Sequence, residues 1–184
     1  MRTEKMRNQL INRLSINDIY SLCLQTQGKE NNCLKEELYQ LTFDENDRVS
    51  FNALWALSHF DEANNPWLFQ KHDELIDRVL VEKNGTKRRL MLHLLLRQPF
   101  EEESLRSDFI DFCIAKITAC SQPYAIRCYC MKLAYEQMKY YPELLTELKV
   151  ALDMLEQEAL SPGLLSAKRQ IMKKIMRSLG KFGK

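Results

Sequence analysis

The sequence predicts an all-α fold, a right-handed α–α superhelix of about five antiparallel helix pairs. One indication is a basic residue that recurs about every 40 residues and each time begins an apolar stretch, at Arg48, Arg88, Arg127 and Lys168. A fixed period of this length is typical of helical solenoids, in which each repeat is a pair of helices. A second indication is composition. Only 5 Gly and 5 Pro occur among 184 residues, and no stretch alternates apolar and polar residues as a strand would.

Proline, glycine and short polar segments divide the chain into its predicted helices. Turn segments such as DEND at 44–47 and KNGT at 83–86 mark the junctions, and all five prolines fall at junctions because proline interrupts a helix interior. The predicted helices are 3–14, 17–27, 31–42, 47–60, 66–83, 87–97, 101–119, 123–139, 142–158 and 164–179. Their short connections place consecutive helices antiparallel to each other.

The predicted helices show two apolar patterns. In 66–83 and 142–158 the apolar residues form a single stripe, which indicates one buried face. In 47–60 and 87–97 apolar residues occupy almost the whole circumference, which is typical of a helix with neighbours on all sides. We therefore predict that each pair contributes an outer helix with one buried face. Its inner helix should pack between that partner and the adjacent pairs.

Two segments carry a recurring local pattern. The first, DENDRVSFNALWAL from Asp44, has an acidic turn, an arginine and then a run of Val, Ala and Leu. The second begins at Ser121 and contains Pro123, Arg127 and the same kind of apolar run. Thr86 replaces the acidic turn residue in the intervening unit. In these features the chain resembles the HEAT and armadillo class of α-solenoids and, more weakly, the DNA-alkylation-repeat proteins.

This resemblance implies a single HEAT-like solenoid domain over residues 1–184. Residues 1–42 would form a degenerate N-terminal cap, and residues 164–184 a basic C-terminal capping helix and tail. Terminal repeats of solenoids are often atypical in this way, because one side of each has no neighbouring repeat.

Charge is divided between the two helix types, although the net charge of the chain is only +2. The last three inner helices and the tail (87–97, 123–139 and 164–184) contain 14 Lys and Arg against one acid, Glu136. The matching outer segments (66–83, 100–119 and 142–158) contain 6 Lys and Arg against 14 acids. If the inner helices line the concave side, that side is positive and concentrates anionic partners.

We therefore predict a non-catalytic binding or scaffold module that holds an acidic protein segment on a basic concave surface. The predicted contact residues are Arg88, Arg89, Arg127, Lys132, Lys173 and Arg177. One alternative is a nucleic-acid-binding protein related to the DNA-alkylation-repeat enzymes, in which the same cations would neutralise phosphates without reading sequence. Another is a non-catalytic subunit of a larger enzyme.

Purely structural interpretations of these charges also remain open. The ladder of basic residues at 48, 88, 127 and 168 could supply hydrogen bonds or ion pairs between repeat units at the turns. The basic tail could be the polar outer face that a terminal repeat needs.

The sequence contains no motif that indicates catalysis or a cofactor. GxSxG, HExxH and a glycine-rich phosphate loop are absent, and the three histidines are isolated, so we predict no enzyme activity, cofactor, metal site or small-molecule substrate. No stretch approaches the roughly 18 apolar residues that span a bilayer, and the charged start of the chain does not resemble a secretory signal. Six cysteines without CxxC spacing suit a reducing compartment, so we predict a cytoplasmic protein without membrane attachment.

Overall fold

The computed structural model describes residues 2–157 and 160–182, and all regular elements in that part of the chain are helical. The all-α, solenoid-like prediction is confirmed. Two compact units divide the chain, unit 1 from Met1 to Asp73 and unit 2 from Glu74 to Lys184. A single domain with cap segments 1–42 and 164–184 stays a prediction.

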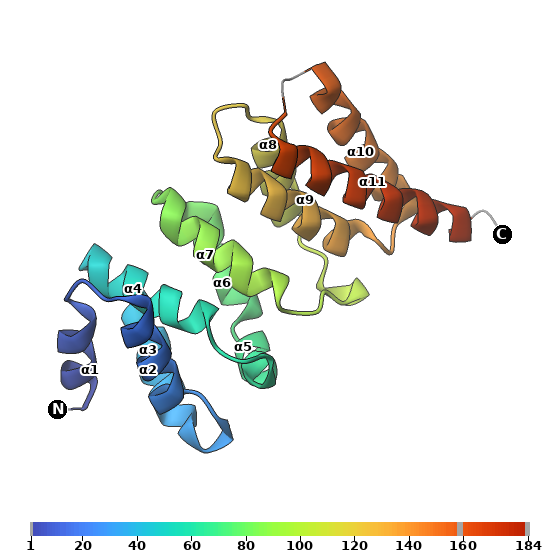
Figure 1. The fold of residues 1–184 in the computed structure, drawn as a ribbon. Helices are drawn as coiled ribbons and strands as arrows, with labels where there is room; N and C mark the ends of the chain where they lie inside the picture. Colours follow the sequence, from blue (N-terminus) through green and yellow to red (C-terminus); the bar gives the residue numbers. More distant parts are fainter. Residues whose placement is uncertain (1, 158–159, 183–184) are drawn as a thin grey trace. The chain divides into compact units, whose positions relative to one another are not determined.

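Unit 1 is built from short helices (Figure 1). They are α1 (Arg2–Leu10), α2 (Ile16–Thr26), η1 (Lys29–Asn31), α3 (Asn32–Gln40), η2 (Leu41–Phe43), α4 (Asp47–Ser58), η3 (Glu62–Asn64) and α5 (Asn65–Phe69). Both α3 and α4 pack against α1 and α2 and against each other. Their shared core includes Leu10, Ile19, Leu38, Val49 and Leu54, none of which has measurable exposure.

Polar turn residues begin these helices. The Ser15 hydroxyl accepts a hydrogen bond from the Asp18 amide, and the Asp18 carboxylate accepts one from the Ser15 amide. Asn46 caps α4 in unit 1, and Asn84 caps the corresponding inner helix in unit 2, each accepting from two amides of the first turn. Such side chains satisfy amides that have no partner inside the helix. The DEND and KNGT segments are therefore helix starts as well as turns.

An ion pair joins α1 to the turn before α4. Arg7 presents its guanidinium edge to Asp44, with Nε 2.6 Å from Oδ2 and a terminal nitrogen 3.0 Å from Oδ1. The hydrogen bond from Arg7 lowers the pKa of the Asp44 carboxyl below its usual value, against the opposing effect of burial. Asp44 also accepts a hydrogen bond from the Asn46 amide. The carboxylate form is therefore the one that the fold stabilises.

Replacing Asp44 by asparagine is expected to make unfolding less sensitive to acid. A carboxyl whose pKa falls on folding contributes stability that is fully present above its unfolded pKa, about 4. That contribution is lost as the pH falls through the folded value. Between about pH 5 and pH 2 the wild-type chain should lose more stability in urea titrations than D44N. The exposed neighbour Glu45, changed to glutamine, should follow the wild-type curve. Equal acid dependence for all three proteins would contradict this role of Asp44.

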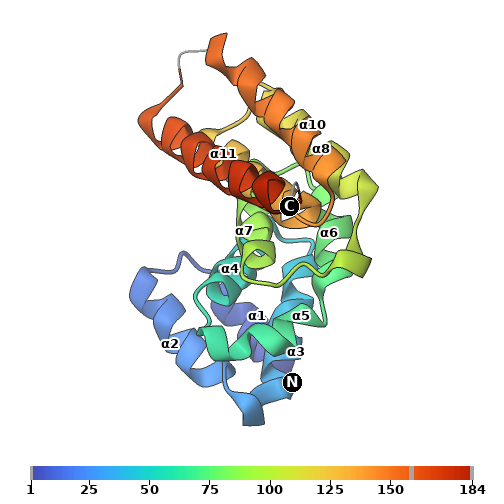
Figure 2. The same ribbon diagram turned by 90° about the vertical axis from the view of Figure 1, so that its right-hand side faces the viewer.

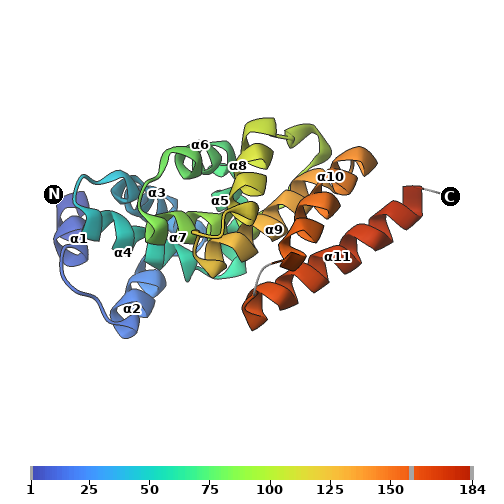
Figure 3. The same ribbon diagram turned by 90° about the horizontal axis from the view of Figure 1, so that it is seen from above.

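Unit 2 has two layers of helices. Its elements are most of α6 (His72–Val81), then α7 (Gly85–Leu96), η4 (Glu102–Ser104), α8 (Ser107–Thr118), α9 (Tyr124–Met138), α10 (Pro142–Asp153), η5 (Met154–Gln157) and α11 (Pro162–Phe182). Figure 3 shows α6, α8 and α10 in one layer and α7, α9 and α11 in the other. Here the first set is called the outer layer and the second the inner layer. Figure 2 shows the long α11 lying beside α10, against which it packs.

Helix α9 of the inner layer has neighbours on several sides. Helix α9 packs against α7, α8, α10 and α11. Its buried residues lie on several sides of the helix, and Cys130, Met131, Leu133, Ala134 and Met138 have no measurable exposure. In the outer helix α10, by contrast, the buried residues Leu145, Leu148 and Leu152 form one stripe.

The predicted helix 66–83 is wrong as a single element, because it divides into α5 and α6. The amides of Gln70 and Lys71 bond three residues back, to Trp67 and Leu68, and this tight turn ends α5. Tertiary contacts favour the break. The Trp67 ring lies edge-on to Tyr39, and the Lys71 ammonium reaches Glu36 at 2.8 Å. The local sequence has no proline or glycine that would signal the interruption.

The predicted helix 101–119 begins too early. Glu101 and Ser104 cap each other around the short η4 turn, which contains Glu102 and Glu103. The backbone at Arg106 is extended, and its amide donates to Gln137 of α9 at 3.0 Å, so α8 begins only at Ser107. Helix α10 ends at Asp153, and α11 extends beyond the predicted 179 to Phe182. The predicted end of the 142–158 helix lies outside the described residues.

Candidate partner-binding surface

Two arginines of the basic ladder close turns within helix pairs. The Arg88 guanidinium donates to the carbonyl of Glu82, directly after α6, and Arg127 Nε donates to the carbonyl of Ile117 at 2.9 Å. Both carbonyls lie at the C-terminal end of an outer helix, where they lack a helical partner and where the helix dipole favours a cation. These hydrogen bonds run inside one pair. Bonds of the ladder residues between repeat units stay a prediction.

The other two ladder residues differ from each other. Arg48 is exposed at the start of α4, whereas Lys168 is only 6% exposed within α11. The shared sequence period therefore does not impose one shared role.

The structure places the six predicted contact residues in different environments. Arg127 is only 2% exposed, so it cannot serve as a contact residue in this conformation. Arg88 is half-buried, and its guanidinium lies over the Phe112 ring at 5.7 Å. The remaining four are accessible, because Arg89 and Lys132 are half-buried and Lys173 and Arg177 are exposed. None of these four forms an ion pair with any residue that the structure describes.

A cavity of about 480 Å³ opens on the inner layer of unit 2. Its walls come from the end of α7, from the middle of α9 and from α11. The lining residues are Leu96, Gln98, Lys132, Glu136, Gln170, Ile171 and Lys174. Two cations, one carboxylate, two amides and two aliphatic side chains thus surround one space, which we call the inner-layer cavity. This composition suits a ligand that combines negative charge with a short apolar stem.

Glu136 is held between two lysines beside this cavity. Its Oε2 lies 3.0 Å from the Lys139 ammonium and its Oε1 lies 3.4 Å from the Lys174 ammonium. Burial disfavours the charged form of Lys139, but Glu136 and Tyr140 favour it more strongly, so the pKa of Lys139 is raised. The Lys174 ammonium also lies 5.0 Å from the centre of the Tyr135 ring. Tyr135 is fixed in turn by a 3.0 Å hydrogen bond between its hydroxyl and that of Ser178.

Sequence reasoning missed Lys174, Gln170 and Glu136 as members of this site. It selected Lys173 and Arg177 because they share a helical stripe with Arg169. The available signal was a different stripe of α11, Gln170–Lys174–Ser178, which is spaced by four residues and borders the buried Ile171. That stripe faces α9, as the contacts from Lys174 to Glu136 and from Ser178 to Tyr135 show.

Helix α7 extends the accessible surface from the cavity toward its own start. Arg89, His93 and Leu96 follow one another at helical spacing on one side of α7. The His93 ring lies 5.9 Å from the Tyr129 ring of α9. We define the basic inner surface as five accessible cations of α7, α9 and α11, namely Arg89, Lys132, Lys173, Lys174 and Arg177.

Two cations of the outer layer are engaged with acids. Arg106 lies 2.7 Å from Asp77 and 2.7 Å from Asp108, and the hydrogen bonds that its guanidinium donates to Asp108 and Asp77 raise the pKa of this group. Lys149 pairs with Asp153 at 2.7 Å along α10. The charges of Arg106 and Lys149 are thus locally compensated, unlike those of Arg89 and Lys132.

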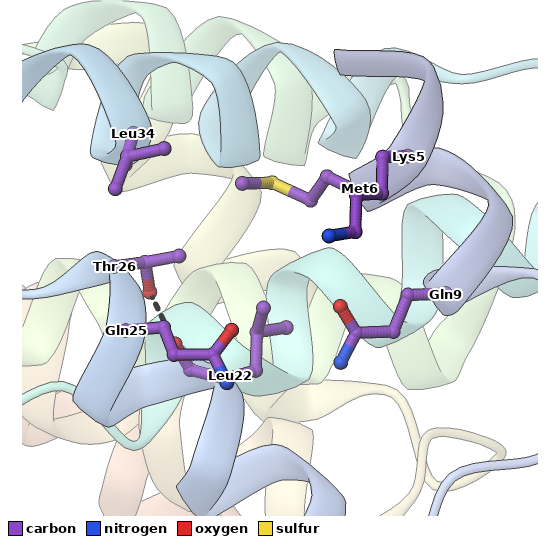
Figure 4. A pocket seen from close by; sticks show the side chains of 7 residues that line it. All are labelled: Lys5, Met6, Gln9, Leu22, Gln25, Thr26 and Leu34. Carbon is purple, nitrogen blue, oxygen red and sulfur yellow. Dashed lines mark hydrogen bonds between the residues drawn. The ribbon is translucent and has the colours of Figure 1, made fainter. Parts of the chain in front are cut away.

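Unit 1 contains two further hollows. The first, about 180 Å³, lies among α1, α2 and α3, with Met6, Leu22 and Leu34 as its apolar walls (Figure 4). Lys5, Gln9, Gln25 and Thr26 complete its lining, and the Thr26 hydroxyl donates to the Leu22 carbonyl at 2.7 Å. The second, about 440 Å³, is a shallow hollow beside Trp67 and Glu36. Neither hollow carries more than one lysine, so neither matches the charge of the inner-layer cavity.

The described residues contain no cluster of three or more His, Cys, Asp or Glu side chains that could hold a metal ion. Burial raises the pKa of the Cys23 thiol to about 11, and burial with a neighbouring thiol also raises the pKa of Cys113. Thiols with raised pKa values are poor nucleophiles. Among the described helices, none combines the length and hydropathy that a bilayer crossing requires.

The chain was compared with protein families, with curated proteins and with solved structures. A family model described as HEAT repeat domain matches residues 6–175. The chain belongs to the HEAT repeat family. Neither the curated proteins nor the solved structures gave a significant match. HEAT repeat proteins are generally interaction scaffolds and generally non-catalytic. The weaker resemblance to DNA-alkylation-repeat proteins gains no support from these comparisons.

Proposed function

We propose that this HEAT repeat protein is a non-catalytic scaffold that binds an acidic segment of another protein on the basic inner surface of unit 2. The observation that carries the proposal is the unbalanced charge around the inner-layer cavity. Lys132 and Lys174 line the cavity, and Arg89, Lys173 and Arg177 lie on the same three helices. Glu136 is the one acid within these helices.

Unpaired surface cations support this proposal because their charge is available to a partner. The two charges of a surface ion pair largely cancel each other's electric field. A group of cations without acidic partners, by contrast, attracts anionic partners and speeds their encounter. Lys132 is half-buried at the cavity wall. A carboxylate that reaches it is partly removed from water, where a charge–charge interaction is stronger than at an open surface.

Replacing both cavity lysines, K132Q/K174Q, is expected to weaken binding of a glutamate-rich peptide about tenfold. This corresponds to roughly 1.4 kcal/mol for two charge contacts. Fluorescence anisotropy with a labelled peptide at low ionic strength measures the effect. The control variant K83Q/K149Q removes the same charge, at one exposed and one half-buried lysine outside the inner layer, and should leave the affinity nearly unchanged. Equal losses in both variants would show that net charge, not this surface, governs binding.

A duplex DNA probe distinguishes the nucleic-acid alternative in the same assay. Binding of DNA depends steeply on salt, because each neutralised phosphate releases counterions. Tighter binding to generic duplex DNA than to the acidic peptide, with such a slope, would replace the protein-segment proposal. Membership of a larger enzyme assembly is compatible with the scaffold role, and a cytoplasmic location stays a prediction.

A further inference from the structure

We propose that Glu136 is an internal competitor for the inner-layer cavity, and that a glutamate side chain of the partner segment binds there by taking Lys174 from it. The inference rests on the proposed function and names the residue that lowers the affinity for the acidic segment. Glu136 is the single acid of α7, α9 and α11, and it already presents a carboxylate to one of the two cavity lysines. It therefore occupies the position that an incoming carboxylate would need.

The two contacts of Glu136 are unequal in a way that permits exchange. Lys139, three residues after Glu136 and directly after the end of α9, lies 3.0 Å from Oε2. Lys174 approaches Oε1 at 3.4 Å from α11, and its side chain is 52% exposed. Losing the longer and more exposed contact leaves Glu136 paired with Lys139. The Glu136 carboxylate therefore keeps one ion pair when a partner carboxylate binds Lys174.

Lys174 also keeps its place during such an exchange. Its ammonium lies over the Tyr135 ring at 5.0 Å, and the Tyr135 hydroxyl is bonded to Ser178 one turn further along α11. A cation over an aromatic face is held there by the ring quadrupole. The lysine is thus positioned by a group that does not compete with the incoming acid.

The remaining lining favours a glutamate over a bare anion. Leu96 and Ile171 offer aliphatic surface for the methylene stem of a glutamate, and Gln98 and Gln170 provide amides at the cavity. Lys132, which forms no ion pair with any described residue, supplies a second cation that Glu136 does not occupy. An acidic peptide can therefore bind Lys132 directly, whereas it must displace Glu136 to bind Lys174.

The experiment measures dissociation constants for the labelled glutamate-rich peptide in a double-mutant cycle of E136Q and K174Q. E136Q alone should bind about twofold to fivefold more tightly than wild type, which is the scale of one partly exposed ion pair. In the K174Q background, E136Q should give little or no gain, because the contested lysine is absent. E143Q removes an exposed acid from the outer helix α10 and controls for net charge. E136D, with a shorter side chain, should lie between wild type and E136Q.

The outcomes separate the two proposals. If E136Q increases the affinity equally with and without Lys174, the effect comes from the net charge, and the proposed competition is overturned. The absence of any increase in affinity overturns it as well. In both cases binding by the wild type leaves the scaffold function standing. Failure of every variant to bind the peptide at low ionic strength overturns the proposed function itself. Circular dichroism of each variant confirms that the helices are retained.

Discussion

Replacing Arg127 by alanine is expected to lower the free energy of unfolding by about 3 kcal/mol. The side chain is 2% exposed, and its Nε donates to the Ile117 carbonyl in the last turn of α8. Alanine leaves that carbonyl without this donor, which costs about 1–3 kcal/mol at a buried site. It also removes the packed aliphatic stem. Urea denaturation followed by circular dichroism measures the loss.

Two variants separate the parts of this effect. R127M keeps most of the stem but not the donor, so it should lose less stability than R127A. R48A changes the ladder residue two sequence steps earlier, where the arginine is exposed, and should alter stability by less than about 0.5 kcal/mol. A loss in R48A as large as that in R127A would mean that position in the repeat, not burial, decides the role of these arginines.

The apolar pattern of the helices predicted the fold well, because it depends directly on which sides of each helix are buried. A helix with several neighbours is apolar on the sides that face them, and α9 packs in this way against α7, α8, α10 and α11, with Lys132 and Glu136 at the inner-layer cavity. Starts of helices were also readable, since Asn46 and Asn84 occupy equivalent cap positions in their turns. Both features depend on residues that are near each other in the chain, so they can be predicted from the sequence.

Interruptions of helices were not predictable, because distant residues cause them. The break after α5 accompanies contacts of Trp67 and Lys71 with residues of α3. The extended backbone at Arg106 depends on Gln137, which lies 31 positions later. Neither segment carries a glycine or proline at the break. Tertiary contacts there override a local preference for helix.

The candidate site was predicted only in its overall charge. Arg89 and Arg127 both lie near the start of an apolar inner helix, yet one is accessible and the other is buried. The difference depends on which side of the helix faces a neighbour. The pair of Glu136 and Lys174 likewise joins residues 38 positions apart, so it requires knowledge that α9 and α11 are adjacent. The charge count predicted a basic layer. The cavity within that layer could not be predicted, because it depends on how the helices pack.

Replacing Leu133 by alanine in α9 is expected to lower the free energy of unfolding by about 3 kcal/mol, within the range of about 2–5 kcal/mol for buried leucines. Leu133 has no measurable exposure, and α9 has neighbours on four sides, so the surrounding helices cannot all close on the vacated space. Leu144 of the outer helix α10 is only half-buried, and L144A should cost about 1 kcal/mol because water and side chains can fill its place. Urea titrations of both variants should give unchanged slopes and different midpoints. Similar midpoints would contradict the layered arrangement of unit 2, since an inner helix and an outer helix would then tolerate the same cavity.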